Sequence, residues 1–256
     1  MTRNILKAGL RERRRLAGFW LSLGSPAVAE LAAQSGIDWL LIDMEHAPTD
    51  LAEVADQLRA AQAGAVGVAV RLPFSEPVIV KRLLDIGAQN LMFPMIGTAE
   101  EARAAVSWTR YPPGGIRGIS ATVRANAYGR QKDYLARYSG EQCVIVQVET
   151  PQAMANIPEI AAVEGVDAVF IGPGDLAASM GHAGDPAAPE VQAAIAEGVE
   201  RIHAAGLPAG ILGYGEAAAR AYFDLGCEFV AIGGDTWLLA RSMDGLAEAF
   251  VDRTGR

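Results

Sequence analysis

Residues 143–176 read CVIVQVETPQAMANIPEIAAVEGVDAVFIGPGDL, and this stretch decides the fold. Two short apolar runs, Cys143–Val148 and Val166–Gly172, enclose a helical pattern. Each run has about the length of a strand and is nearly continuous in apolar residues, as expected where both faces of a parallel sheet are buried. The stretch therefore predicts a strand–helix–strand unit with parallel strands.

The same alternation continues through nearly the whole chain. The further strand-like runs are Ala17–Leu23, Trp39–Asp43, Gly67–Leu72, Asn90–Met95, Ala209–Leu212 and Phe229–Gly233. Helical patterns lie between them, among them Asp50–Ala63, Pro77–Ile86, Thr98–Arg110 and Pro189–Ala205. Eight such units in 256 residues favour an α/β fold of the closed (β/α)8 (TIM barrel) type over an open doubly wound sheet. We expect residues 1–256 to form a single barrel domain.

Two segments interrupt this rhythm. Residues 111–130 are rich in Gly, Pro and Arg, and a shorter interruption covers residues 181–189. Loops of this length are uncommon in compact domains and are often functional. We expect irregular excursions from the barrel at both places.

Composition excludes several classes of protein. The net charge of −8 argues against a nonspecific nucleic-acid binder. No apolar run reaches the roughly 18 residues that a membrane-spanning helix needs. The two cysteines, Cys143 and Cys227, form neither a disulfide framework nor a metal knuckle. We expect a cytoplasmic protein.

Polar residues gather where the predicted strands end, which is where barrel enzymes place their active sites. They are His46 after the second strand, Arg71 at the end of the third, Gln147 and Glu149 on the fifth, Gly174 and Asp175 after the sixth, and Leu212-Gly213-Tyr214 after the seventh. Polar groups inside apolar strands are costly unless they are paired or bind a ligand. The set therefore predicts a functional site.

Each residue taken alone also has a structural interpretation. Arg71 could pair with Glu149 in a purely structural ion pair, and His46 could cap a helix. Glu149 and Asp175 each precede a helical pattern and could serve as helix N-caps. Asp85 lies near the end of a predicted helix, where an acid is usually solvated.

The inventory of side chains narrows the chemistry. Lys7, Lys81 and Lys132 all lie away from strand ends, so no lysine is placed to form a Schiff base. One imidazole, one guanidinium and two carboxylates remain. Two carboxylates with open positions suit a hard cation such as Mg²⁺ or Mn²⁺. A cation and an arginine would stabilise an enolate, and His46 would move the proton.

Four segments resemble one family. They are WLLIDMEH (39–46), RYPPGGIRG (110–118), VQVET (146–150) and VFIGPGDL (169–176). With nearly constant spacing from about Ala17 to Ala240, the chain resembles the HpcH/HpaI aldolases of the phosphoenolpyruvate/pyruvate barrel superfamily. The resemblance implies reversible aldol cleavage of 4-hydroxy-2-oxo acids into pyruvate and an aldehyde through a metal-stabilised enolate. Oxaloacetate decarboxylation would be a plausible side reaction.

The resemblance also implies a role for each site residue. Glu149 and Asp175 would hold a divalent cation, which is Mg²⁺, Mn²⁺ or Co²⁺ in this family. Arg71 would contact the 2-oxo oxygen of pyruvate. His46 would act as the base, directly or through water, and Asp85 would raise its basicity. The other substrate contacts would come from Gln147, Gly174, Asp175 and Leu212.

The resemblance implies a homohexamer, a trimer of dimers that exchange the C-terminal helix Thr236–Val251. Met44 and Gly213-Tyr214 depart from some family members and flank the presumed aldehyde side, so the acceptor aldehyde stays open. Arg117 and Arg124 of the first excursion face either the substrate, a neighbouring subunit or solvent.

Three rival functions stay open at the level of sequence. A CoA-ester lyase of the citrate or malyl type would share the barrel and the metal chemistry. A phosphate-binding isomerase is indicated only by Gly233-Gly234 and would leave Glu149 and Asp175 unused. A non-catalytic binding module would have no need of the complete set of polar side chains.

Overall fold

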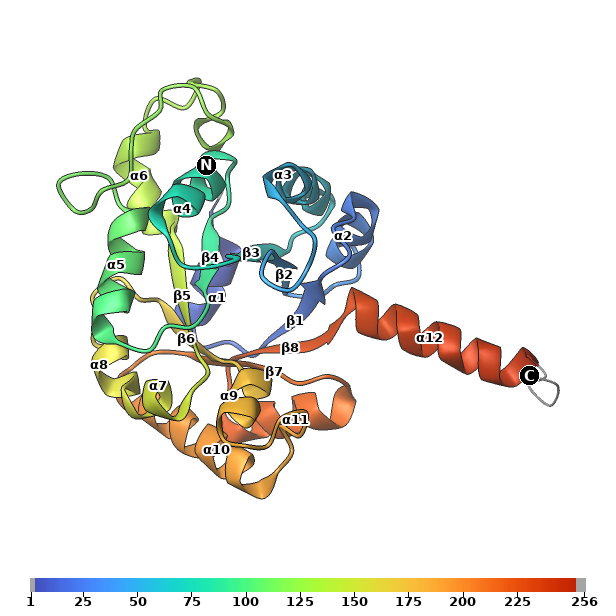
Figure 1. Cartoon of the computed structure of the whole chain (residues 1–256). Helices are drawn as coiled ribbons and strands as arrows, with labels where there is room; N and C mark the ends of the chain where they lie inside the picture. The colour runs from blue at the N-terminus through green and yellow to red at the C-terminus, as the bar shows by residue number, and fades with distance from the viewer. Residues whose placement is uncertain (1–2, 252–256) are drawn as a thin grey trace.

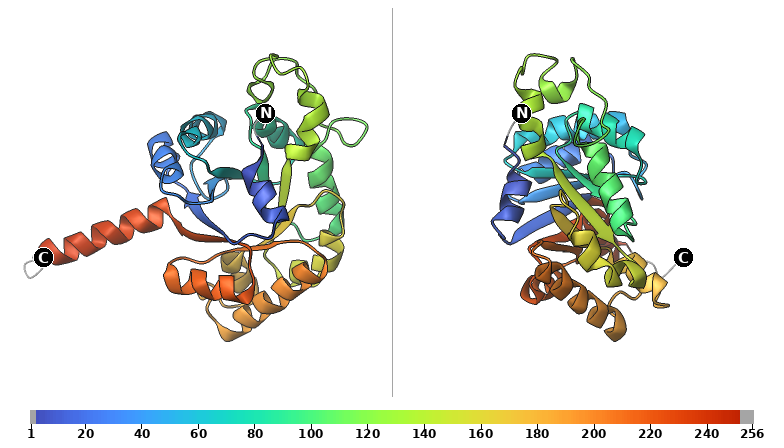
Figure 2. Two further views of the ribbon diagram at one scale, coloured as in Figure 1. Left: turned by 180° about the vertical axis from the view of Figure 1, so that it is seen from behind. Right: turned by 90° about the vertical axis from the view of Figure 1, so that its left-hand side faces the viewer.

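The eight strands close into a parallel barrel, and helices surround it (Figures 1 and 2). A computed structural model describes residues 3–251, so the remaining residues of the predicted 1–256 domain lie outside this description. The strands are β1 (Leu16–Leu21), β2 (Trp39–Asp43), β3 (Gly67–Arg71), β4 (Asn90–Phe93), β5 (Cys143–Val148), β6 (Ala168–Ile171), β7 (Ala209–Leu212) and β8 (Phe229–Gly234). Each strand pairs with its neighbour in sequence, and β8 pairs with β1.

The helices between α1 and α12 occupy the connections between the strands, whereas α1 precedes β1 and α12 follows β8. They are α1 (Ile5–Arg11), α2 (Pro26–Ala33), α3 (Leu51–Ala60), α4 (Pro77–Asp85), α5 (Ala99–Thr109), α6 (Tyr134–Glu141), α7 (Pro151–Ala155), α8 (Ile157–Ala161), α9 (Pro173–Ser179), α10 (Pro189–Ala204), α11 (Glu216–Leu225) and α12 (Asp235–Phe250). Single 3₁₀ turns cover Ala61–Ala63 and Arg124–Asn126. No helix within residues 3–251 is long and apolar enough to cross a membrane.

The predicted (β/α)8 barrel is confirmed, with small differences at the ends of elements. The fourth strand stops at Phe93, two residues before the predicted end, because Met95 adopts a left-handed backbone with φ of 56°. The predicted helix Asp50–Ala63 divides into α3 and a 3₁₀ turn, and Asp50 forms its capping box with Glu53. Residues 111–123 and 181–188 are irregular, as predicted.

The inside of the barrel is filled by every second strand residue. Trp39 and Leu41 of β2 belong to the interior cluster, whereas Leu40 and Ile42 belong to the layer between strands and helices. Gly18 makes room for this packing, because an added Cβ would lie 1.9 Å from the ring of Trp39. Leu6 and Leu10 of α1 belong to the same interior cluster, so α1 closes the amino end of the barrel.

The same alternation carries polar side chains into the last inward layer. Three polar residues each lie two positions after an interior residue of the same strand. Asp43 follows Leu41, Arg71 follows Ala69, and Gln147 follows Ile145. All three are at least nine-tenths buried. Because side chains two residues apart in a strand point to the same face, these polar side chains also point into the barrel. They form a polar layer above the apolar interior, at the carboxyl ends of the strands.

Arg117 fastens the long excursion between α5 and β5 to the barrel. Its side chain is completely buried, and Nη2 donates to Oδ1 of Asp85 at 2.7 Å. The guanidinium lies over the rings of Tyr111 and Tyr138, with its carbon 4.6 Å and 4.8 Å from the ring centroids. This contact joins the excursion to the end of α4.

Replacing this buried cation should destabilise the fold. We expect Arg117→Met to lower the free energy of unfolding by about 3 kcal/mol, because it leaves the Asp85 carboxylate without its partner. Urea denaturation measures the change. Arg103→Met on the exposed side of α5 is the matched control and should stay within about 0.5 kcal/mol of the wild type. Equal stability of the two variants would show that the Arg117 contact contributes little.

Candidate active site

A buried ion pair forms the base of the polar layer. Nε and Nη2 of Arg71 donate to the two carboxylate oxygens of Asp43 at 2.9 and 2.7 Å. The indole Nε1 of Trp20 donates to Asp43 as well, and the guanidinium carbon lies 4.9 Å from the Trp20 ring centroid. Burial opposes ionisation of Asp43, but the hydrogen bond and the charge of Arg71 outweigh it and lower the pKa of that carboxyl group. The guanidinium is thus held in one orientation.

Glu45 and His46 follow directly after β2. Nη1 of Arg71 lies 2.9 Å from Oε2 of Glu45, and Oδ1 of Asp43 accepts the Glu45 backbone N–H at 3.0 Å. His46 is exposed, and its backbone N–H points at the same oxygen at 3.5 Å. The Asp43 carboxylate therefore orients both the arginine and the turn that carries the histidine.

Glu149 lies at the end of β5 with both carboxylate oxygens in use. Oε1 accepts the backbone N–H of Met95 at 2.8 Å, and Oε2 accepts from Nε2 of Gln147 at 2.5 Å. Gly172 gives this carboxylate its space, because an added Cβ would lie 2.3 Å from Oε2. Thr150, not Glu149, caps α7, so the cap interpretation of Glu149 is wrong.

Asp175 and Gly174 belong to the exposed first turn of α9. Gly172 holds the N-cap position, so the cap interpretation of Asp175 is wrong as well. The first α-helical hydrogen bond of α9 runs from Leu176 to the Gly172 carbonyl, which leaves the backbone N–H groups of Gly174 and Asp175 ahead of it. Leu212 at the end of β7 packs on the interior cluster below.

The charges at this end of the barrel are predominantly negative. Burial raises the pKa of Glu149, and the charges of Glu45 and Asp175 raise it further, against the hydrogen bonds from Gln147 and Met95. Burial likewise raises the pKa of Glu45, with Arg71 and His46 opposing and with Asp43 and Asp175 adding to the shift. The carboxylates therefore repel one another, and a bound cation would relieve that repulsion.

The donor set fits a hard divalent cation. It consists of carboxylate oxygens, and Oε1 of Gln147 is a further buried acceptor without a hydrogen-bond partner among the described residues. Within residues 3–251, no group of three or more His, Cys, Asp or Glu side chains is arranged to hold a metal. The carboxylates of Glu149 and Asp175 could serve as protein ligands, with water and substrate oxygens completing the shell.

The structure separates three residues from their predicted surroundings. Arg71 pairs with Asp43 and Glu45, so the alternative interpretation, a structural ion pair with Glu149, is wrong. Asp85 contacts Arg117 at the end of α4 and enters no described contact with His46. Because α4 runs back toward the amino ends of the strands, this Asp85 lies at the far end of the barrel from His46. Met44 is buried in the layer between strands and helices, and not at the aldehyde side.

Sequence reasoning assigned no role to Asp43, Glu45 or Trp20. Strand alternation could have found Asp43, because it lies two residues after the interior residue Leu41 and pairs in register with Arg71. Trp20 follows the same rule on β1. Glu45 lies beyond the strand, where alternation no longer applies.

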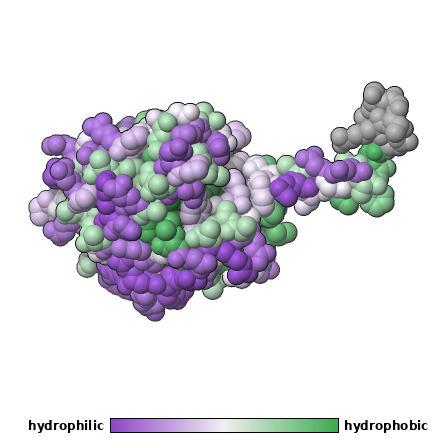
Figure 3. Space-filling model, turned by 90° about the horizontal axis from the view of Figure 1, so that it is seen from below, coloured by the Kyte–Doolittle hydropathy of each residue, from purple (hydrophilic) through white to green (hydrophobic). Residues whose placement is uncertain are grey.

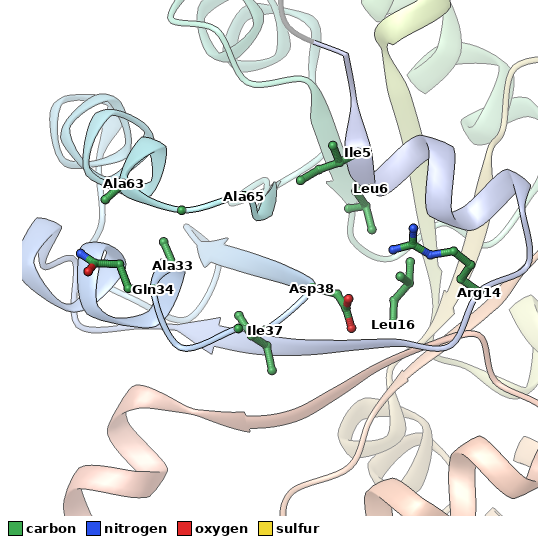
Figure 4. A pocket seen from close by; sticks show the side chains of 12 residues that line it. Ile5, Leu6, Arg14, Leu16, Ala33, Gln34, Ile37, Asp38, Ala63 and Ala65 are labelled. Carbon is green, nitrogen blue, oxygen red and sulfur yellow. The ribbon is translucent and has the colours of Figure 1, made fainter.

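A cavity of about 630 Å³ lies away from this site. Figure 4 shows it between the start of α1 and the residues that precede β2 and β3, among them Asp38 and Ala65. It therefore opens at the amino ends of the strands. The polar layer at the opposite end remains the candidate active site.

Comparisons with known proteins show the family to which the chain is similar. Residues 16–242 match the family model described as HpcH/HpaI aldolase/citrate lyase. The 4-hydroxy-2-oxo-heptane-1,7-dioate aldolase of Shigella flexneri is 50% identical over 248 residues, covering 96% of this chain and 93% of that protein. The same enzyme of Klebsiella pneumoniae is also 50% identical, with 96% and 94% covered. The crystal structure of a HpcH/HpaI aldolase/citrate lyase family protein from Burkholderia cenocepacia superposes with a TM-score of 0.91 at 45% identity, covering 96% of this chain and 99% of that one.

The space beside Glu149 makes Gly172 a sensitive position. We expect Gly172→Ala to push the carboxylate aside and to weaken Mn²⁺ binding by about 10-fold or more. Calorimetric titration of the metal-stripped protein measures the affinity. Gly140→Ala in α6 is the control, since an added Cβ there meets nothing within 4 Å. An unchanged affinity of Gly172→Ala for Mn²⁺ would contradict the role of Glu149 as a ligand of the cation.

Proposed function

This chain belongs to the HpcH/HpaI aldolase/citrate lyase family, and from that premise we propose that it is a metal-dependent pyruvate aldolase. It would cleave and form 4-hydroxy-2-oxo acids, giving pyruvate and an aldehyde. One observation carries the proposal: a guanidinium fixed by Asp43 faces the same barrel end as a repelling carboxylate pair, Glu149 and Asp175. An aldolase that works without an imine needs these charges.

Glu149 and Asp175 would hold the divalent cation, with Mg²⁺, Mn²⁺ and Co²⁺ as the candidates. When bound, the cation would fix the 2-oxo acid and supply positive charge that favours its enolate. Gln147 would position Glu149 through its 2.5 Å hydrogen bond. The Met95 backbone N–H would hold the other oxygen of that carboxylate.

The chain's own residues would perform the remaining steps. Arg71 would donate to the 2-oxo oxygen of pyruvate and stabilise the negative charge that develops there. The backbone at Gly174 and Asp175 would bind the substrate carboxylate, and Leu212 would contact its apolar side. His46 would take a proton from the pyruvate methyl group, directly or through water. Asp85 could raise the basicity of His46 only from another subunit, because its own chain places it at the opposite end.

The C-terminal helix supports an assembly of several subunits. α12 extends away from the barrel (Figures 1 and 2), and Asp235 is its only buried residue. Figure 3 shows apolar side chains in green on this projecting helix. One stripe of them, at i, i+4, i+7 and i+11, consists of Leu239, Met243, Leu246 and Phe250, which are 46–83% exposed. We propose that two single-domain subunits exchange this helix and that three such dimers form a hexamer.

The first test of the function needs no aldehyde. In D₂O, the metal-stripped protein with Mg²⁺ or Mn²⁺ should exchange the methyl protons of pyruvate, followed by NMR after the metal is removed. We expect Glu149→Gln to abolish the metal-dependent exchange and His46→Ala to slow it by about 100-fold or more. The control is Glu159→Gln on α8, an exposed acid far from the site. Absence of metal-dependent exchange in the wild type would overturn the aldolase proposal.

The second test concerns assembly. We expect the double variant Leu239→Glu and Met243→Glu to dissociate the oligomer, because two charges would be buried in an apolar contact. Light scattering coupled to size exclusion measures the mass. Gly245→Glu, on another side of α12 with open space around it, should leave the mass unchanged. A wild-type monomer would contradict the exchange of α12.

A further inference from the structure

A small basic cavity lies at the amino end of the barrel, opposite the candidate active site. It has a volume of about 270 Å³ and lies between α1, the ends of α5 and α6, and the residues that precede β5 and β6. Active sites of such barrels lie at the carboxyl ends of the strands, so the proposed aldol chemistry does not use this cavity. Its lining therefore needs an explanation of its own.

Three cations line this cavity. They are Lys7 and Arg11 of α1 and Arg110, which directly follows α5. Asp167 is the only acid among the described lining residues, so three cations and one carboxylate leave two net positive charges. In a chain with a net charge of −8, such a local excess of positive charge attracts anions.

Only one of the three cations has a carboxylate partner within residues 3–251. Nζ of Lys7 lies 2.9 Å from Oδ1 of Asp167 and also donates to the backbone carbonyl of Gln142. This buried pair fixes the ammonium group in the wall of the cavity. Arg11 and Arg110 enter no ion pair and no side-chain hydrogen bond with a described residue. Two guanidinium groups therefore keep donors that an anion can use.

The packing around Arg110 directs its guanidinium to the cavity. An added Cβ at Gly165, another lining residue, would lie 2.1 Å from Nη2 of Arg110. The guanidinium therefore lies against this glycine, in space that a larger residue would fill. Arg110 also begins the segment RYPPGGIRG (110–118), and the proposed aldol chemistry gives this arginine no role.

A buried acceptor in the lining has no partner. Gln142 is 6% exposed, and its Oε1 has no hydrogen-bond partner among the described residues. Such a group indicates a bound water, ion or ligand beside it. A hydrogen phosphate ion has oxygens that accept from guanidinium groups and a hydroxyl that donates to such an acceptor. A dicarboxylate has no such donor.

We propose that this cavity is a binding site for a small dianion of the phosphate type. The two charges of the anion match the two net positive charges of the lining. Arg11 and Arg110 donate to its oxygens, and Lys7 adds its charge while it stays paired with Asp167. The volume is below the range of about 300–1,000 Å³ for drug-sized ligands, which favours a small ion. The bound anion joins α1 to the starts of β5 and β6 and so stabilises the closed amino end.

The test is a calorimetric titration of the metal-stripped protein with inorganic phosphate, succinate and acetate. The ionic strength is kept constant, because salt screens such contacts. For the wild type we expect phosphate to bind with a Kd about 10-fold or more below those of succinate and acetate. Arg110→Gln should raise the Kd for phosphate by about 10-fold or more, since two donors and a charge are lost. Arg103→Gln, on the exposed side of α5, removes the same charge nearby and should leave the Kd unchanged.

A second variant guards against misfolding of the first. Arg11 is exposed, so Arg11→Gln leaves the packing intact and should raise the Kd for phosphate by about 5-fold or more. Phosphate should also raise the Tm of the wild type and of Arg103→Gln more than that of Arg11→Gln. The same Kd in all three variants would place the anion elsewhere and overturn the proposal. Equal or tighter binding of acetate or succinate would overturn the assignment to a phosphate-type dianion.

Discussion

The buried pair of Arg71 and Asp43 is the constraint on which the barrel mouth depends. A guanidinium that is only 6% exposed is costly unless its donors are satisfied, and Asp43 satisfies two of them within 2.9 Å. Trp20 then covers the guanidinium face, while Asp43 also holds the backbone after β2. Removing the carboxylate would leave Arg71 mobile and the His46 turn unfastened. One carboxylate therefore orients two groups of the proposed chemistry.

The second constraint is repulsion among carboxylates. The charge of Asp175 raises the pKa of both Glu45 and Glu149, and one arginine cannot neutralise these carboxylates together with Asp43. Backbone and amide donors hold Glu149 in place despite its burial. The site thus keeps a fixed, electron-rich oxygen cluster at a cost to stability, as expected of a site organised for a ligand. A divalent cation bound there, as proposed, would offset this cost by relieving the repulsion.

Much of the fold could be predicted because burial on both faces makes parallel strands continuous in apolar residues. The eight predicted runs overlap the eight strands, and the polar residues at their carboxyl ends do meet at one end of the barrel. Which side chains in that polar layer pair with one another could be predicted less accurately. Arg71 was considered with Glu149, yet strand register places Asp43 directly beside it. Pairing across the barrel depends on register and side-chain reach, which apolar runs do not encode.

The same reasoning explains the failure at Asp85 and Met44. A helix between two strands runs back to their amino ends, so Asp85 at the end of α4 cannot approach His46 within one chain. Asp85 instead forms an ion pair with Arg117, which belongs to the irregular excursion between α5 and β5. Met44 follows Asp43 and therefore points outward by the alternation that turns Asp43 inward.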